Sequence, residues 1–527
     1  MGPPMADDGV RAERESDLKS VARGGTLNFI GSVVNGVLQF VLVVVVTQAL
    51  TKREAGAFFE AVALFIILSN TCELGADTGL TRMIPRLRVL GRIADIRRSM
   101  AVGILPGFVA GILLAEITFF LADPLAAIFT NHQHTDAERV ATYIRVLAAF
   151  LPVSAAYTVS IAATRGFGTM LPNALVDRIG RAVLQLLGVG AVVIAGGGAF
   201  GVALGWGMPI LLAFGVALVW LVRLITKVEN QPGERVAPTS AGALWSEFWK
   251  FTAPRGLTGV FQVTILWIGT LLVGSLLDAA HASVYTASTR YLVAGSVVNY
   301  AIITAIAPKL SELLSGDERE RARDVYQVAT CWLMTLAWPL YFTLAIFAPL
   351  LLKVFKPEYV TGATSLEILA LAMLVATAIG PVDIVLLMGG RSMWNLFNVV
   401  VALVLNLALS FLLVPRIGIA GAACAWAASI LFNNIAPLAE IRAFLKLHPF
   451  GRGFPVVSTS AALCFGAFGM AIRMSVGLSI PSFAVYLIVA SVAYAALMWR
   501  FRGRAELELL AGTLRARRGR RARPVTA

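Results

Sequence analysis

The sequence predicts an all-α polytopic membrane protein. Of its 527 residues, 58% are hydrophobic and only 14% are charged, whereas about 25% of the residues of a soluble protein are charged. The mean hydropathy is +0.79. This composition argues against a water-soluble enzyme, and the number of apolar segments and the distribution of cations support the same class.

Fourteen segments are long and apolar enough to cross a bilayer, which takes about 20 residues. Their number is even, so both ends of the chain are expected on the same side. The segments lie near 27–49, 57–81, 100–122, 143–164, 172–195, 199–225, 250–273, 283–306, 327–348, 364–387, 394–414, 418–441, 456–476 and 482–500.

The cations indicate which side that is. If the N-terminus is cytoplasmic, 35 of the 44 Lys and Arg residues fall on the inner side and eight on the outer side. Such an excess is typical of cytoplasmic loops. We therefore expect cytoplasmic termini, and the net charge of +14 needs no nucleic-acid partner.

An internal repeat suggests two lobes. Glu54 to Pro85 and Asp278 to Pro308 each run from an acidic residue through an apolar helix to a proline beside a cation. Gene-doubled transporters show this pattern, and two six-helix lobes would then be related by a pseudo-twofold axis along the membrane normal. The expected parts are a cytoplasmic segment 1–26, an N-lobe 27–226, a linker 227–249, a C-lobe 250–442, two added helices in 443–500 and a basic tail 501–527.

Arg290 is the sharpest candidate for a functional residue. It lies inside a predicted span, where a charged side chain costs about 2.5–3.5 kcal/mol. A guanidinium in a polar cavity can hold a phosphate through two hydrogen bonds. A structural ion pair, or snorkelling to the outer surface, is the alternative.

The second span carries Glu73, Asp77 and Arg82. Glu73 and Asp77 are four residues apart and share a helix face. They are candidates for a cation or proton site, for recognition of sugar hydroxyls, and, with Arg82, for coupling or gating. An ion pair between Asp77 and Arg82 is the structural alternative.

Other polar residues of predicted spans are weaker candidates. Arg255 follows Pro254 at the inner end of its span and is placed to meet an entering phosphate, with positive-inside anchoring as the alternative. Asp383 follows Pro381, where a broken helix can expose backbone carbonyls, and an ion pair with Arg391 is its alternative. The side chains of Asn28 and Asn35 can bind sugar hydroxyls, with interhelical hydrogen bonds as the alternative.

No cofactor, metal or catalytic residue is expected. The four cysteines lie singly in apolar runs, without the paired spacing of a disulfide framework or a zinc site. The arginine-rich tail has few aromatic residues, so a membrane anchor is favoured over an RNA-binding segment.

Several motifs resemble those of the Wzx-type polysaccharide exporters of the MOP flippase superfamily. A Gly-Arg turn precedes an asparagine-rich helix, and a Pro-x-x-Gly-x-x-Gly-Ala-Ala sequence opens the next. The repeat carries further marks of the family. The residues are Gly390, Arg391, Asn395, Asn398, Asn406, Pro415, Gly418, Gly421, Ala422, Ala423, Gly56, Leu74, Gly75, Arg82, Tyr285, Ala287 and Arg290.

The resemblance implies a MOP-like fold and a function without catalysis. Such proteins move an oligosaccharide linked to a polyprenyl diphosphate from the inner to the outer leaflet of the bacterial cell membrane. The sugar and diphosphate cross in a polar cavity, and the polyprenyl chain stays in the bilayer. Polymerase or glycosyltransferase machinery is the implied partner.

One departure and several alternatives stay open. Many relatives carry a carboxylate midway along the seventh helix, where this chain has Thr264, Leu266, Trp267 and Gly269, so coupling through that carboxylate is in doubt. A lipid II flippase shares the fold and the carrier. A cation-coupled multidrug or solute antiporter usually has an acidic residue in the first span, and 27–50 contains none. A polyprenyl-dependent membrane enzyme would be expected to have a large outer loop, and a non-transporting scaffold would not need Arg290.

Overall fold

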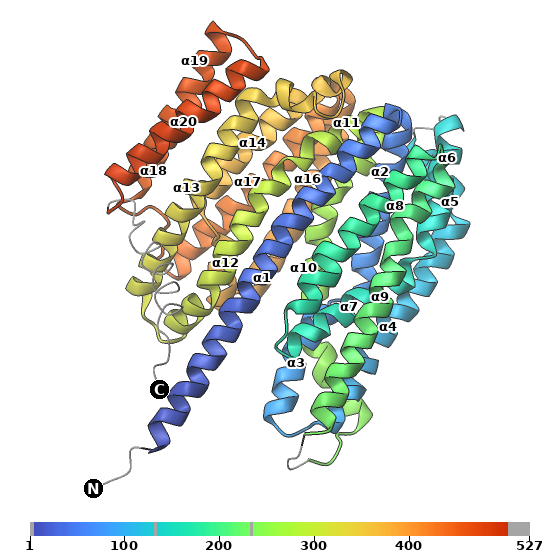
Figure 1. Cartoon of the computed structure of the whole chain (residues 1–527), viewed down its shortest axis with the longest axis vertical. Coiled ribbons are helices and arrows are strands. Elements are labelled where there is room, and N and C mark those ends of the chain that lie inside the picture. Colours follow the sequence, from blue (N-terminus) through green and yellow to red (C-terminus); the bar gives the residue numbers. More distant parts are fainter. Residues whose placement is uncertain (1–4, 131–133, 232–235, 504–527) are drawn as a thin grey trace, which may run out of the picture. The chain divides into compact units, whose positions relative to one another are not determined.

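The computed structural model describes residues 5–130, 134–231 and 236–503. It is helical throughout this part of the chain, with no strand among the described elements (Figure 1). Most of the predicted basic tail, 504–527, lies outside these residues. The all-α prediction is confirmed.

Contacts divide the chain into two compact units, Met1–Thr286 and Ala287–Ala527. The predicted lobe boundaries stay a prediction, and the contacts place α10 with the first unit. The first unit holds α1 (Met5–Ala49), α2 (Lys52–Glu73), α3 (Ala76–Val89), α4 (Ala94–Phe120), α5 (Ala122–Phe129), α6 (His134–Ala148), α7 (Leu151–Gly166), the π-helix η1 (Asn173–Arg181), α8 (Ala182–Ile194), α9 (Ala199–Glu229), α10 (Ala241–Leu276) and most of α11 (Ala279–Arg290).

The second unit holds the remaining helices. They are α12 (Leu292–Ser315), α13 (Arg319–Leu352), the 3-10 helix η2 (Pro357–Gly362), α14 (Ala363–Ile379), α15 (Val382–Met388), α16 (Ser392–Ile417), α17 (Ile419–Phe444), α18 (Phe454–Ala461), the π-helix η3 (Ala462–Ala467), α19 (Phe468–Ser475) and α20 (Ile480–Arg500).

Most of the fourteen predicted segments are single long helices. Among the described residues, twelve spans are long and apolar enough to cross a membrane. The pair Ala137–Ala148 and Leu151–Gly166, bent by 48°, makes a thirteenth if it is counted as one span. The predicted segment 172–195 corresponds to the π-helix η1 followed by α8. The chain is therefore a multi-pass membrane protein.

Helix α2 begins and ends for clear local reasons. Thr51 and Glu54 form a capping box at its start, because the Thr51 hydroxyl accepts from the Glu54 N–H and the Glu54 carboxylate accepts from the Thr51 N–H. At its end the backbone turns left-handed at Leu74 and Gly75, with φ of 53° and 77°. This break separates α2 from α3 inside one predicted span.

The backbone of α10 lies directly against this break. A Cβ at Gly256 would lie 2.4 Å from the Leu74 carbonyl oxygen, and a Cβ at Gly75 would lie 2.6 Å from the Gly256 backbone. Two glycines are thus needed for the backbones to meet. Beside them, Phe248 of α10 packs with Leu80 and Ile84 of α3 in a buried core.

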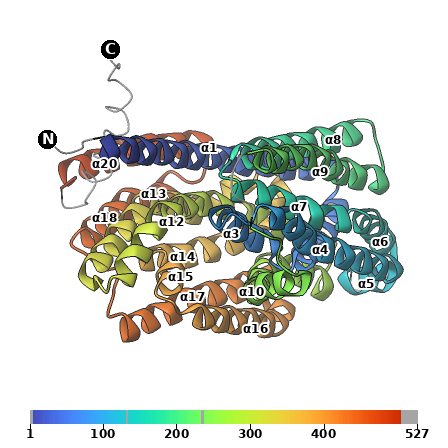
Figure 2. The ribbon, with the colours of Figure 1, turned by 90° about the horizontal axis from the view of Figure 1, so that it is seen from below.

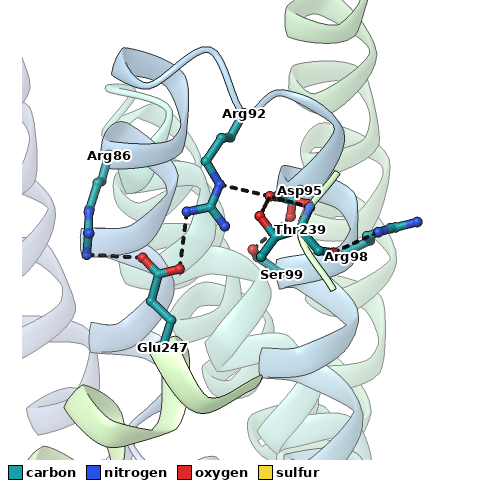
Figure 3. Close-up of polar contacts among 7 residues, drawn as sticks. All are labelled: Arg86, Arg92, Asp95, Arg98, Ser99, Thr239 and Glu247. Atoms are coloured by element: carbon teal, nitrogen blue, oxygen red, sulfur yellow. Dashed lines mark hydrogen bonds and ion pairs between the residues drawn. The ribbon is translucent and has the colours of Figure 1, made fainter. Parts of the chain in front are cut away.

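Thr239, in the middle of the predicted linker 227–249 and just before α10, is bound by Asp95 of α4, as Figure 3 shows. The carboxylate accepts hydrogen bonds from the Thr239 N–H at 3.1 Å and from its hydroxyl at 2.7 Å. Arg98 donates to the Thr239 carbonyl oxygen at 3.1 Å. Because Asp95 is fully buried, its hydrogen bonds replace the water that it loses.

Arg92 extends this contact to α10. Its guanidinium donates to Asp95 at 2.9 Å and to Glu247 at 3.2 Å, and Arg86 also pairs with Glu247, at 3.1 Å. Burial lowers the pKa of Arg92, but the two carboxylates outweigh this effect and hold it above its usual value. We call Arg86, Arg92, Asp95, Arg98, Thr239 and Glu247 the linker clamp.

In the second unit, the two added helices pack on α13. The Tyr486 ring of α20 lies 4.6 Å from the Phe347 ring, and its hydroxyl is 3.0 Å from the Thr343 hydroxyl. Arg473 of α19 pairs with Glu367 of α14 at 3.0 Å. A buried aromatic core therefore joins these helices to the rest of their unit.

We predict that Gly256→Ala destabilises the protein by about 2 kcal/mol, because the new methyl group must push α10 away from the Leu74 carbonyl. Thermal unfolding of the purified protein measures the effect. Gly259→Ala is the matched control, since only the Asn70 side chain lies within 4 Å of its added methyl, at 3.8 Å. Equal melting temperatures for the two variants would contradict the prediction.

Candidate functional site

A line of polar side chains runs between α1 and the η1–α8 segment of the first unit. Near one end, the Asn173 amide donates to the Asn28 carboxamide oxygen at 2.6 Å. Farther along, the Gln39 amide donates to Gln185 at 3.1 Å. The polar ladder, as we call it, consists of Asn28, Asn35, Gln39, Asn173, Asp177, Arg178, Arg181 and Gln185.

Asp177 is the centre of the ladder. Its carboxylate accepts from the Tyr157 hydroxyl at 3.1 Å and from the Arg181 Nε at 3.2 Å. Arg178 pairs with the same carboxylate at 3.6 Å. Arg181 also donates to Gln185 at 3.3 Å. Two guanidinium groups thus share one carboxylate, and this leaves a positive excess at the centre of the ladder.

The π-helix explains why these side chains line up. Asn173, Asp177, Arg181 and Gln185 follow each other at intervals of four residues, and the first three lie in η1. The wider turn of a π-helix brings residues four apart more nearly onto one face than an α-helix does. π-helical turns are rare and frequently found at functional sites.

A second charged group lies at the α2–α3 break. Glu73 is buried, near the Thr158 hydroxyl, and within electrostatic range of Asp77, Asp177 and Arg165. The charged residues at the α2–α3 break and the polar ladder together bring three carboxylates and three arginines into one region of the first unit. Such pairing is what allows charges to lie inside a helical membrane bundle.

Three buried polar atoms in this region have no hydrogen-bond partner among the described residues. They are the Asn35 carboxamide oxygen, the Arg165 Nε and the Arg178 Nε, which has only its 3.6 Å ion pair with Asp177. An unsatisfied buried polar group costs about 1–3 kcal/mol. These atoms are therefore free to bind a ligand with hydroxyl or phosphate groups.

The predicted α1 residues are thus part of the site. Asn28 makes the interhelical hydrogen bond that was its structural alternative, whereas the Asn35 oxygen stays available. Glu73 and Asp77 are brought together with Asp177 and Arg165.

Arg82 and Arg255 lie apart from the ladder. Both are exposed, and the Arg82 guanidinium stacks 3.9 Å from the centre of the Phe251 ring. The contact between Arg82 and an aromatic ring replaces the ion pair with Asp77 that the spacing suggested.

The structure places Arg290 and Asp383 in the second unit. Arg290 is half-buried at the end of α11. The neighbouring residues fix this end, since Ser288 donates to the Gly362 carbonyl at 3.1 Å and Tyr291 to the Leu351 carbonyl at 2.6 Å. Asp383 lies in the first turn of α15, after Pro381.

Sequence reasoning missed Tyr157, Arg165, Asp177, Arg178 and Arg181. A signal was present, because Asp177, Arg178 and Arg181 fall inside the predicted span 172–195, and charges inside a span are a default indication of function. The two arginines were instead attributed to an inner loop.

Comparisons with known proteins agree with this architecture. The chain matches the family described as polysaccharide biosynthesis protein over residues 21–314. It is 24% identical over 246 residues to the probable low-salt glycan biosynthesis flippase Agl15 of Haloferax volcanii. That alignment covers 45% of this chain and spans about half, 49%, of the relative.

Solved structures share the fold at low sequence identity. The lipid II flippase MurJ, in an inward closed conformation, has a TM-score of 0.72 at 12% identity, with 91% of this chain and 99% of MurJ covered. An inward-facing multidrug resistance transporter of the MATE family has a TM-score of 0.64 at 13% identity, with 78% and 94% covered. Because the family match extends over more than half of the sequence, the chain belongs to the family of polysaccharide biosynthesis proteins, and it has the fold of MOP-superfamily transporters.

Proposed function

We propose that this protein is a flippase for a polyprenyl-diphosphate-linked oligosaccharide. It would move the glycan from the inner to the outer leaflet of the bacterial cell membrane by alternating access, for surface polysaccharide biosynthesis. The termini would be cytoplasmic, and polymerase or glycosyltransferase enzymes would act before and after it. The protein itself would form and break no covalent bond.

The observation that carries the proposal is the charged region of the first unit. Arg181 donates to the Gln185 amide oxygen and shares Asp177 with Arg178, and Arg165 lies within electrostatic range of Glu73. The Asn35 oxygen and the Arg165 Nε have no hydrogen-bond partner among the described residues. Guanidinium groups bind phosphate oxygens in pairs, and amides bind sugar hydroxyls. A ligand with a diphosphate and several hydroxyls satisfies both sets of groups.

The ladder also suggests how binding is reversible. Asp177 occupies the two arginines in the absence of a ligand, and its contact with Arg178 is the longer one, at 3.6 Å. An entering diphosphate would displace Asp177 from Arg178 first. Exchange of one anion for another keeps the arginines paired throughout and avoids the cost of an isolated charge in the bundle. Arg290 and Arg255 stay predicted contacts for the diphosphate, and Asp383 for gating.

Two other functions are compatible with parts of the structure. A lipid II flippase has this fold, and its substrate is also a sugar linked to a polyprenyl diphosphate. A multidrug or solute antiporter has it too, as the MATE comparison shows. Residues 27–50 hold no carboxylate for cation coupling, so the antiporter is the weaker alternative.

Deletion of the gene tests the function directly. We expect one completed oligosaccharide to accumulate on its polyprenyl diphosphate carrier, measured by mass spectrometry of extracted lipids. Accumulation of the peptidoglycan precursor instead would assign the protein as a lipid II flippase. An unchanged lipid-linked pool with intact surface polysaccharide, in a strain without a second such flippase, would contradict both.

Arg165→Ala tests the charged region. We expect at least a tenfold loss of transport at normal membrane levels, because one charge-assisted hydrogen bond is worth about 1.5–3 kcal/mol. Arg165→Lys should retain part of the activity. Arg442→Ala is the control, since Arg442 is exposed and has no charged partner within the described residues. Full transport by Arg165→Ala would remove this residue from the site.

Membrane potential is a further test. An anion that moves outward gains about 2.3 kcal/mol per charge per 100 mV when the inside is negative, so two charges gain roughly 4–5 kcal/mol. We expect transport in proteoliposomes to accelerate under an inside-negative potential and to slow when the polarity is reversed. A rate that ignores the imposed potential would exclude net movement of charge with the substrate.

A further inference from the structure

A groove runs along one face of α9, the helix labelled in Figures 1 and 2 that follows α8 in the chain. Its volume is about 510 Å³. We call it the α9 groove, and its lining residues are Gly215, Val216, Val219, Trp220, Arg223, Leu224 and Lys227.

One half of the α9 groove is apolar and open. Val216 and Val219 are 50% and 53% exposed. Nothing lies within 4 Å of a Cβ built on Gly215, so this glycine leaves a notch in the surface of the helix. The opposite face of α9 packs inward through Ala217 and Leu221. In a membrane protein, the apolar half would therefore contact lipid chains.

The other half of the groove is cationic. Arg223 and Lys227 are exposed and four residues apart, and no carboxylate among the described residues pairs with either. The acid that follows them, Glu229, pairs with Arg97 at 3.0 Å. Trp220 lies between the apolar and cationic halves, and tryptophan is enriched at the membrane interface.

The length of the groove fits the headgroup end of one leaflet of a bilayer. Gly215 and Lys227 are separated by 12 residues, or about 18 Å along a helix. One leaflet contributes roughly half of the ~30 Å hydrocarbon core. The apolar half, from Gly215 to Trp220, covers about 7.5 Å of this length and would contact the part of a lipid chain nearest the headgroup, and the cations lie where the headgroup would be.

We propose that the α9 groove is a binding site for an anionic glycerophospholipid of the surrounding bilayer. A chain would lie along Gly215, Val216 and Val219, and the phosphate would contact Arg223 and Lys227. Charge complementarity excludes a neutral or cationic lipid as the preferred occupant. The glycan-bearing substrate is disfavoured, because among the described lining residues the Trp220 N–H is the one side-chain group besides the two cations that could bind a sugar hydroxyl.

Native mass spectrometry of the purified full chain tests the site. The probes are phosphatidylglycerol and phosphatidylcholine with identical acyl chains. We expect preferential retention of one phosphatidylglycerol, and about thirtyfold weaker binding for the double variant R223Q/K227Q, since each cation contributes about 1 kcal/mol. Gly215→Leu should also weaken binding by filling the notch, while improving helix propensity.

The matched control is R442Q/K446Q. It removes two exposed cations with the same spacing, one in the last turn of α17 and one just after the helix, and should retain phosphatidylglycerol. Three results would each overturn the proposal: equal loss in the control and groove variants, equal retention of the two lipids, or displacement of phosphatidylglycerol by an equimolar polyprenyl diphosphate.

Discussion

The sharing of one carboxylate by two arginines is the interaction on which the polar interior of the first unit depends. Without Asp177, Arg178 and Arg181 would be like charges side by side in an apolar bundle, and the Tyr157 hydroxyl would lose its acceptor. Removing one member of a fully buried charge pair costs about 3–5 kcal/mol, and the loss of Asp177 would cost less, because these three side chains are 19–34% exposed. The same carboxylate therefore stabilises the unliganded protein and competes with any anion that enters.

The α2–α3 break links this electrostatic arrangement to the backbone. Glu73 is the last residue of α2 and Asp77 the second of α3, so the left-handed turn at Leu74 and Gly75 sets the distance between them. Gly256 of α10 rests against that turn. A shift of α10 would therefore displace this turn, and with it Glu73 and Asp77, through direct contact between backbones.

The sequence was sufficient to predict the fold class and most helix positions. The thickness of the bilayer sets the length and the apolar composition of each spanning helix, and both can be recognised without knowledge of tertiary contacts. Only part of the charged region could be predicted from the sequence. Glu73, Asp77 and Asn35 stood out as polar residues within apolar runs. Sequence reasoning counted Arg178 and Arg181 with an inner loop and did not single out Asp177, because a π-helix has no simple sequence signature. The contact of Arg82 with Phe251 could not be predicted from the sequence, because the two residues lie far apart in the chain, on α3 and α10.

The linker clamp bears on how genes of this family can recombine. The linker appears in the sequence as the natural joint between two halves, yet Asp95 and Arg98 hold Thr239, and Arg86 and Arg92 hold Glu247. A chimera joined within 227–239 would pair α10 from one parent with α2, α3 and α4 from another. Every carboxylate–guanidinium match and the Gly75–Gly256 contact would then have to be compatible across parents. Exchanges that keep α10 with the first half preserve these contacts, so the effective module boundary lies one helix later than the linker.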